Sequence, residues 1–266
     1  MIGTVIPVQP VVLAGARAGG DPLCRSEGVV SKAVIRIADK PMLARVLTAL
    51  AASRASLPAH VIGLDAATLA LAADGIPSLP VMAKGQGPAA SLLAALDGQI
   101  APPLLVTTCD HALLTPAMID NFLAQSIASG ADLTVGLAER ATIEAAYPET
   151  RRTYLRLGGA ELSGCNLFYL ATPQAASVLR FWQDAERDRK KPWRIAWRFG
   201  PLTALRILLA RLIGRPGPDA VFALLSRALG VRVQPVILPF AEAAIDVDSP
   251  GDLTLVREIL ARRTAG

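Results

Sequence analysis

The chain has 266 residues, of which 52% are hydrophobic, 18% are charged and 5% are aromatic. This composition permits a large buried core and excludes a chain that is disordered throughout. The three cysteines are odd in number and widely spaced, which excludes a disulfide framework and a CxxC zinc pair and favours a reducing compartment. No basic and apolar leader and no uninterrupted apolar run of about 18 residues is visible. We therefore expect a soluble, cytoplasmic protein.

The net charge of +5 is concentrated in one segment. Residues 187–215 contain seven Arg and two Lys but one Asp, a local charge of +8, which leaves −3 for the rest of the chain. The segment carries a leucine stripe rather than stacking aromatic residues, and no nucleic-acid-binding motif accompanies it. The pattern argues against a nucleic-acid partner. It favours an anionic substrate, a partner protein or a peripheral contact with the inner membrane surface.

Predicted strands and helices alternate along the chain. In chain order we predict strand Val11–Ala14, helix Pro41–Ala52, strand Val61–Leu64, helix Ala66–Ala73, strand Val81–Ala83, helix Pro88–Leu96, strand Leu104–Cys109, helix Pro116–Ser129, strands Leu133–Leu137, Tyr154–Leu157 and Asn166–Leu170, helices Gln174–Lys190, Pro201–Ile213 and Ala220–Leu229, strand Val231–Leu238 and helix Pro250–Arg262. This order predicts an α/β domain spanning residues 1–266, with a parallel or mixed sheet covered by helices on both faces. Residues 183–230 form a basic helical insert within it. In such sheets the loops at the carboxyl ends of the strands make the ligand site.

The loop after the first predicted strand, Leu13–Arg25, is rich in Gly and Ala. Small residues let backbone N–H groups approach a phosphate closely, and Arg17 and Arg25 add positive charge. The loop contains neither the GxGxxG fingerprint of dinucleotide-binding folds nor the GK[ST] tripeptide of Walker loops. By itself it is explained equally well by a nucleotide-binding loop and by a plain flexible turn.

Lys32 and the sequence DKPML at positions 39–43 follow this loop. Together with LAGA at positions 13–16 and Arg17, they resemble the N-terminal signature of the MobA-like nucleotidyltransferases, which reads LAGG, Arg, Lys and GKPML in the same order. Ala16 replaces a Gly of that signature and the loop is longer, as in a divergent subgroup. The resemblance implies an α/β, three-layer, Rossmann-like fold of the GT-A type with a mixed, mostly parallel sheet.

Four later segments extend the resemblance. KGQGPAAS at 84–91 is similar to the family segment that reads the base, and TTCDHALLTP at 107–116 to the strand end whose Asp binds Mg²⁺. IDVDSPGDL at 245–253 is similar to the late segment that brings a second acid to the metal. SGCNLFYL at 163–170 is similar to the segment whose Asn holds the acceptor.

These similarities imply a role for each matching residue. Leu13, Ala14, Gly15, Ala16, Lys32, Gly87 and Ser91 would bind the nucleotide, Arg17, Lys32 and Asp110 would be catalytic, Asn166 would bind the acceptor, and Asp110 and Asp248 would hold Mg²⁺.

The residue pattern supports the metal site without the resemblance. Asp110 ends an apolar strand, and Asp246 and Asp248 share one face of an extended segment. Mg²⁺ needs one or two carboxylates together with phosphate oxygens and water. Capping of the helix that begins at Pro250 is the alternative role for both late acids. Whether Asp246 joins Asp248 at the metal stays open. His111 is not counted as a ligand, because a lone His in a loop is more often structural.

We therefore predict a Mg²⁺-dependent nucleotidyltransferase that moves a nucleoside monophosphate from an NTP, CTP or GTP, to a phosphorylated small molecule or lipid headgroup with release of pyrophosphate. A phosphate acceptor is already ionised near neutral pH, so the reaction needs no general base. This agrees with the absence of an obvious catalytic His or Cys in the sequence.

Two other functions remain open at this point. A glycosyltransferase of related fold should carry a DxD motif where this chain has Asp110, His111 and Ala112. A non-catalytic nucleotide-binding member would agree with Ala16 but not with the presence of Lys32, Asp110 and Asp248 together. The basic insert is interpreted either as a helical subdomain that packs on the core or in a homodimer, or as a membrane-proximal lid.

Overall fold

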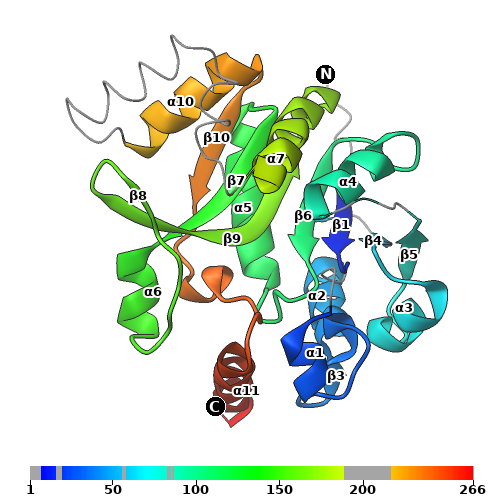
Figure 1. Cartoon of the computed structure of the whole chain (residues 1–266). Helices are drawn as coiled ribbons and strands as arrows, with labels where there is room; N and C mark the ends of the chain where they lie inside the picture. Colours follow the sequence, from blue (N-terminus) through cyan, green and yellow to red (C-terminus); the bar gives the residue numbers. More distant parts are fainter. Residues whose placement is uncertain are drawn as a thin grey trace.

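A sheet of eight strands forms the centre of the computed structural model, which describes residues 7–15, 20–55, 58–82, 85, 87–188 and 217–265. The strand order is β10-β7-β9-β6-β1-β4-β5, and β8 pairs with β9 (Figure 1). The strands are β1 Gln9–Leu13, β4 Ala59–Ile62, β5 Ser78–Val81, β6 Leu104–Thr108, β7 Leu133–Glu139, β8 Leu155–Leu157, β9 Ala160–Leu170 and β10 Val233–Ile237; β2 Arg36–Ile37 and β3 Lys40–Pro41 form a separate ribbon.

The sheet is mixed and mostly parallel, as predicted. β1 is parallel to β4 and β6, β4 to β5, and β7 to β10, whereas β9 is antiparallel to both β6 and β7. The carboxyl ends of β1, β4 and β6 therefore meet at the same edge of the sheet. The loops that follow these three strands can build one site there.

Helices cover both faces of the sheet (Figure 1). They are α1 Pro22–Ser26, α2 Met42–Ala51, α3 Ala66–Ala73, α4 Pro88–Leu96, α5 Pro116–Ser129, α6 Arg140–Ala146, α7 Ala176–Asp188, α10 Pro218–Leu229 and α11 Pro250–Ala265. Side-chain alternation along β1 divides the core between the faces, because Val12 packs with α2, α3 and α5 while Val11 packs with α4 and α7. Both valines are fully buried. The continuous apolar pattern of this strand follows from burial on both faces.

A third apolar cluster lies beyond the carboxyl edge of the sheet. It joins Leu23 of α1, Ile37 of β2, Leu113 of the loop after β6, and Val247 and Leu253 near the start of α11. All five side chains are almost fully buried. The cluster thus brings three segments that are far apart in sequence to the end of β6. The backbone N–H of Val247 donates to the carbonyl of Asp110 at 3.0 Å, which fixes their register.

Several predicted boundaries were wrong. The Gly-rich segment contains α1, which Asp21 caps by accepting from the N–H of Leu23 at 2.9 Å. β5 ends at Val81 rather than beginning there, because its pairing with β4 starts at Ser78. β9 begins at Ala160 rather than at Asn166. The short helix α6 was not predicted, and its one buried residue, Ile143, gives no helical periodicity to detect.

The predicted basic insert falls mainly on residues 189–216, which lie outside the described part of the chain, and so does the predicted helix at 201–213. The described portions of the insert are the end of α7 and α10. The structure confirms the helix predicted around 220–229. Among the described helices, none is long and apolar enough to cross a membrane.

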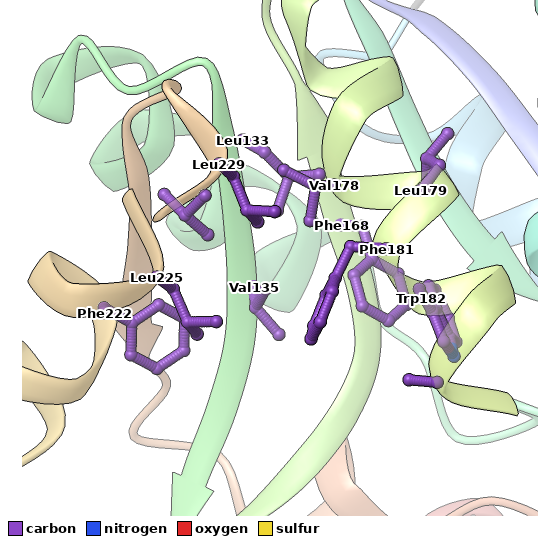
Figure 2. Close-up of a pocket in the computed structure, with 12 residues that line it drawn as sticks. Leu133, Val135, Phe168, Val178, Leu179, Phe181, Trp182, Phe222, Leu225 and Leu229 are labelled. Atoms are coloured by element: carbon purple, nitrogen blue, oxygen red, sulfur yellow. The ribbon is translucent and has the colours of Figure 1, made fainter. Parts of the chain in front are cut away.

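An apolar cavity of about 260 Å³ separates α7 from α10 above the sheet (Figure 2). Phe222 and Leu225 of α10 face it from one side and Trp182 of α7 from the other, with Val135 and Phe168 from the strands between them. The rings of Phe168 and Trp182 lie 5.3 Å apart at an interplanar angle of 40°. Every lining side chain is a hydrocarbon or an indole, so the cavity offers no group for phosphate chemistry.

The end of β4 packs directly on the start of the Gly-rich loop, through Gly63. Gly63 has a φ of +101°, and a Cβ at this position would lie 2.6 Å from the backbone N of Gly15. The amide of Ala14 donates to the carbonyl of Ile62 at 2.8 Å and holds the two segments together.

We expect Gly63→Ala to destabilise the fold more than Gly159→Ala. Gly159 has a similar φ of +92° but nothing within 4 Å of its missing Cβ. Both substitutions strain the backbone, and Gly63→Ala adds an overlap worth about 1–3 kcal/mol of unfolding free energy. Urea denaturation of the two variants measures the difference. Equal losses would contradict the close approach of Gly63 to Gly15.

Candidate active site

Lys32 lies at the centre of a charged cluster at the carboxyl edge of the sheet. It begins the short 3₁₀ helix Lys32–Val34, which Ser31 caps by accepting from the N–H of Ala33. Its side chain is only 11% exposed, although it carries a charge. The ammonium donates to the Oδ1 of Asp248 at 2.5 Å and to the carbonyl of Val247 at 3.0 Å. This buried cation is the focus of the site.

Three carboxylates surround that ammonium, and each comes from a different segment. Asp21 precedes α1, Asp110 follows β6, and Asp248 precedes α11. The Oδ2 atoms of Asp21 and Asp110 are each 3.5 Å from the Lys32 Nζ, in addition to the close contact with Asp248. The predicted residues Lys32, Asp110 and Asp248 thus come together in the structure. The sequence reasoning missed Asp21.

The cluster shifts the pKa values of its members. Burial alone lowers the pKa of Lys32, but the hydrogen bond to Asp248 and the charges of Asp110 and Asp21 outweigh burial, so the pKa is raised overall. Burial raises the pKa of Asp110, and the charges of Asp246 and Asp248 act in the same direction, whereas the side chain of Thr108 and the charge of Lys32 oppose them. Lys32 therefore remains a cation and compensates an excess of negative charge.

Two carboxylates in this cluster fit a magnesium ion that arrives with phosphates. The Oδ1 of Asp110 is buried and accepts no hydrogen bond from the residues that the structure describes. Asp248 contacts the same ammonium as Asp110 and is 44% exposed. No group of three or more His, Cys, Asp or Glu in the described residues is placed to hold a metal by itself. The residues suit a cation whose other ligands are phosphate oxygens and water.

Asp246 has other partners than the cation cluster. Its carboxylate accepts from Arg152 and, at 3.0 Å, from the Nδ2 of Asn166. Asn166 has a φ of +49° where the pairing of β7 with β9 shifts register, and this irregularity directs its side chain to Asp246. The predicted acceptor residue thus lies next to the Asp248 segment. Arg152 was not predicted, because its contacts span about a hundred residues.

The first loop provides the other wall of the site. Leu13 and Ala14 are buried at the end of β1, and Gly15 is exposed. A cavity of about 140 Å³ adjoins Ala14 and is also lined by Val30, Ser31, Gly63, Leu64, Asp65 and Thr68. The predicted residues Ala16 and Arg17 lie outside the described residues. The structure therefore places the start of the predicted nucleotide loop and its second basic residue, Arg25, which is exposed in α1, but not Arg17.

The segment predicted to read the base lies at the start of α4. Gly87 caps this helix with a φ of +108°, which favours glycine. The hydroxyl of Ser91 donates to the carbonyl of Gly85 at 3.4 Å, and a Cβ at Gly85 would overlap the backbone of Ser91. Lys84 lies outside the described residues. α4 follows β5 at the same carboxyl edge as the first loop.

His111 is a core residue. Its side chain is 1% exposed, and burial lowers its pKa to about 4. An uncharged imidazole in the interior agrees with the structural role expected for it.

Comparison with known proteins identifies the class of this enzyme. Residues 10–189 match the model of the MobA-like NTP transferase domain, and the chain belongs to that family. It is a nucleotidyltransferase with the mixed α/β fold that the family signature implied. No curated protein matches the chain.

Solved structures agree with this fold. A hypothetical transferase from Thermus thermophilus is 29% identical, covers 93% of this chain and 100% of its own, and has a TM-score of 0.74. A CMP:2-keto-3-deoxy-manno-octonic acid synthetase in complex with CTP is 14% identical, with 97% and 100% coverage and a TM-score of 0.57. Molybdopterin-guanine dinucleotide biosynthesis protein A from Archaeoglobus fulgidus is 12% identical, with 96% and 100% coverage and a TM-score of 0.51. The last two show similarity of fold alone.

We expect Lys32→Met to destabilise the chain in metal-free buffer by about 1–3 kcal/mol, because it leaves the carboxylates of Asp21 and Asp110, which are 7% and 17% exposed, without their cation. Added Mn²⁺ should restore part of the loss by taking over that charge, and should stabilise the wild type less. Thermal unfolding in EDTA and in Mn²⁺ measures both effects, with Arg180→Met on the exposed side of α7 as the charge-matched control. A Lys32→Met chain of unchanged stability would contradict the cluster.

Proposed function

We propose that the chain transfers a nucleoside monophosphate from CTP or GTP to a phosphorylated acceptor in a Mg²⁺-dependent reaction that releases pyrophosphate. The observation that carries this proposal is the convergence of Lys32, Asp110 and Asp248 beside the first loop. Both substrates are anionic, so the protein has to neutralise and align them. Lys32 provides positive charge for the phosphates, and Asp110 and Asp248 provide negative charge for a divalent metal ion.

Asp110 and Asp248 are the residues that would hold Mg²⁺. When bound, the ion would neutralise the negative charge of the reacting phosphates. The buried, unpartnered Oδ1 of Asp110 among the described residues supports this assignment. So does the position of Asp248, whose segment is fixed to Asp110 through the Val247 amide.

The chain's own groups position the reacting phosphates. Leu13 and Ala14 hold the start of the first loop in place, because the Ala14 amide already donates to Ile62. The backbone of Gly15 and Ala16 binds the triphosphate, and Arg17 and Lys32 offset charge on the α-phosphate and on the leaving pyrophosphate. An oxygen of the acceptor phosphate attacks the α-phosphorus while the bond to pyrophosphate breaks. The attacking oxygen is already ionised, so no side chain has to remove a proton.

The base and the acceptor are assigned to the remaining predicted residues. Gly87 and Ser91 at the start of α4 contact the base, and Asn166 beside Asp246 contacts the acceptor. One solved structure of this fold holds CTP, and another is named for a guanine dinucleotide product. These two proteins justify testing CTP and GTP first.

Pyrophosphate release from each of the four NTPs, with Mg²⁺ and a panel of phosphorylated sugars, polyols and cofactor precursors, tests the proposed reaction. We expect release with CTP or GTP and one acceptor. Asp110→Asn should reduce it at least about 100-fold, because it weakens the charge that holds the metal.

The control for this assay is Asp120→Asn, which changes an acid of α5 outside the charged cluster. Nucleotide binding without turnover on any acceptor would favour the non-catalytic alternative. Turnover of a nucleotide sugar instead of an NTP would favour the glycosyltransferase alternative. Unchanged activity of Asp110→Asn would contradict the metal assignment.

A lipid headgroup is a second class of acceptor, and the insert at 183–230 is the feature that favours it. Its most basic part, residues 187–215, has a net charge of +8 and lies mainly outside the described residues. It connects α7 to α10, the two helices that border the apolar cavity. We propose that this part of the single domain contacts an anionic membrane surface, with contact between two copies of the chain as the alternative.

We expect the chain to sediment with vesicles that contain anionic phospholipid, and to detach as salt is raised, because surface charge interactions are screened. Vesicles of neutral phosphatidylcholine are the control. Binding that is absent, or equal on both vesicles, would contradict the membrane contact. A dimer in analytical ultracentrifugation without vesicle binding would favour the alternative.

A further inference from the structure

The segment that carries Asp248 is neither helix nor strand between residues 245 and 249. Its orientation therefore depends on the single backbone hydrogen bond from Val247 to Asp110 and on side-chain contacts, rather than on a regular backbone ladder. Ile245 and Val247 are fully buried and anchor one side of the segment in the third apolar cluster. The polar side of the segment, with Asp246 and Asp248, needs a separate anchor.

Arg152 is that anchor. Its guanidinium contacts both the carboxylate and, at 3.3 Å, the carbonyl of Asp246, and it donates to the Oδ1 of Asp252 at 2.8 Å. Its side chain is 8% exposed. A buried arginine that serves acceptors on two sides of Asp248 holds the segment from both ends.

The contact with Asp252 reaches Asp248 itself. The other oxygen of the Asp252 carboxylate accepts from the N–H of Asp248 at 3.3 Å, from the N–H of Ser249 at 2.9 Å and from the hydroxyl of Ser249 at 2.6 Å. One carboxylate thus links the guanidinium to the backbone of the proposed metal ligand. Asp252 also closes a capping box with Ser249 at the start of α11, so the same group fixes the helix end.

Arg152 also gives Asp246 and Asp248 different partners. The two oxygens of Asp246 face Arg152 and Asn166, while Asp248 faces Lys32. An arginine can do this because its planar fork donates to several acceptors at once, which a lysine ammonium does not match in geometry.

We propose that Arg152 is a positioning residue, which holds Asp248 in the orientation required for the metal and keeps Asp246 out of the metal site. This inference rests on the proposed function, because it assumes that Asp248 is a metal ligand. Outer partners of metal ligands are worth about 10–100-fold in metal affinity when they are removed. Arg152 acts on Asp248 through Asp252 and through the backbone of Asp246.

The test measures Mn²⁺ affinity by electron paramagnetic resonance in the presence of the NTP that the wild type binds. Arg152→Met should weaken Mn²⁺ binding about 10–100-fold, and Arg152→Lys should give an intermediate loss. The matched control is Arg156→Met, which removes an exposed arginine that pairs with Glu161 at 2.8 Å. It should leave Mn²⁺ affinity unchanged.

A second readout does not involve a metal. Amide hydrogen exchange of residues 246–253 should become faster in Arg152→Met and stay unchanged in Arg156→Met, with the central sheet protected in both. Asp252→Asn weakens the same link with a smaller change of charge and volume. It replaces Arg152→Met if that variant does not fold, and it should weaken Mn²⁺ binding in the same direction.

The outcomes separate the two claims. Wild-type Mn²⁺ affinity in folded Arg152→Met, or in Asp252→Asn where the first variant does not fold, would overturn the positioning role and leave the proposed function intact. A wild-type chain that binds no Mn²⁺ with any NTP would overturn the proposed function and this inference with it. A loss of affinity in Arg156→Met equal to that in Arg152→Met would also overturn the specific role of Arg152.

Discussion

The ammonium of Lys32 among three carboxylates is the interaction on which the site depends. Asp21, Asp110 and Asp248 are far apart in sequence, and their mutual repulsion opposes bringing them together. The buried cation offsets that repulsion, and the apolar cluster of Leu23, Leu113, Val247 and their neighbours holds the three segments in contact. Burial of hydrocarbon and compensation of charge are therefore coupled in one place. The fold places an electrostatically costly cluster at the carboxyl edge of its sheet.

The same coupling gives the two late acids different roles. Asp246 and Asp248 are only two residues apart. Even so, Asp246 accepts hydrogen bonds from Arg152 and Asn166, whereas Asp248 accepts one from Lys32. Each acid thus has its own cation. We propose that the nucleotide and the metal bind next to Lys32 and Asp248 and bring further charges of both signs there. The contacts of Arg152 with Asp246 and Asp252 stay unchanged when they bind. Asp252 links the guanidinium of Arg152 to the backbone of Asp248.

Much of the fold could be predicted because its central elements carry strong local patterns. β1 and β6 are apolar runs buried on both faces, and α5 has the cap Thr115 and a proline at its first turn. The prediction that Lys32, Asp110 and Asp248 lie in the same site followed from the family signature together with the position of Asp110 at a strand end. These features are local in sequence or have a known order, which is why sequence reasoning reached them.

The sequence analysis missed other features because their local signals are weak or because they depend on distant contacts. Asp21 is followed by a proline, and this pair is a recognisable signal for the start of α1. The helix was nevertheless not predicted, because it lies in a segment interpreted as a Gly-rich loop. The first half of β9 was not predicted because its polar residues and the left-handed Asn166 interrupt the alternation of apolar and polar residues that is typical of a strand. Arg152 contacts Asp246 and Asp252 across about a hundred residues, so its role is visible only once the chain has folded.

Asp110 and Asp248 are proposed to form one metal site beside the first loop. An anomalous difference map from crystals grown with Mn²⁺ and CTP or GTP tests it most directly. We predict one Mn²⁺ peak between the carboxylates of Asp110 and Asp248, with nucleotide phosphates as its other neighbours and with Asp246 still bonded to Arg152. Nucleotide density with Mn²⁺ bound elsewhere, or with Asp246 in place of Asp248, would contradict it.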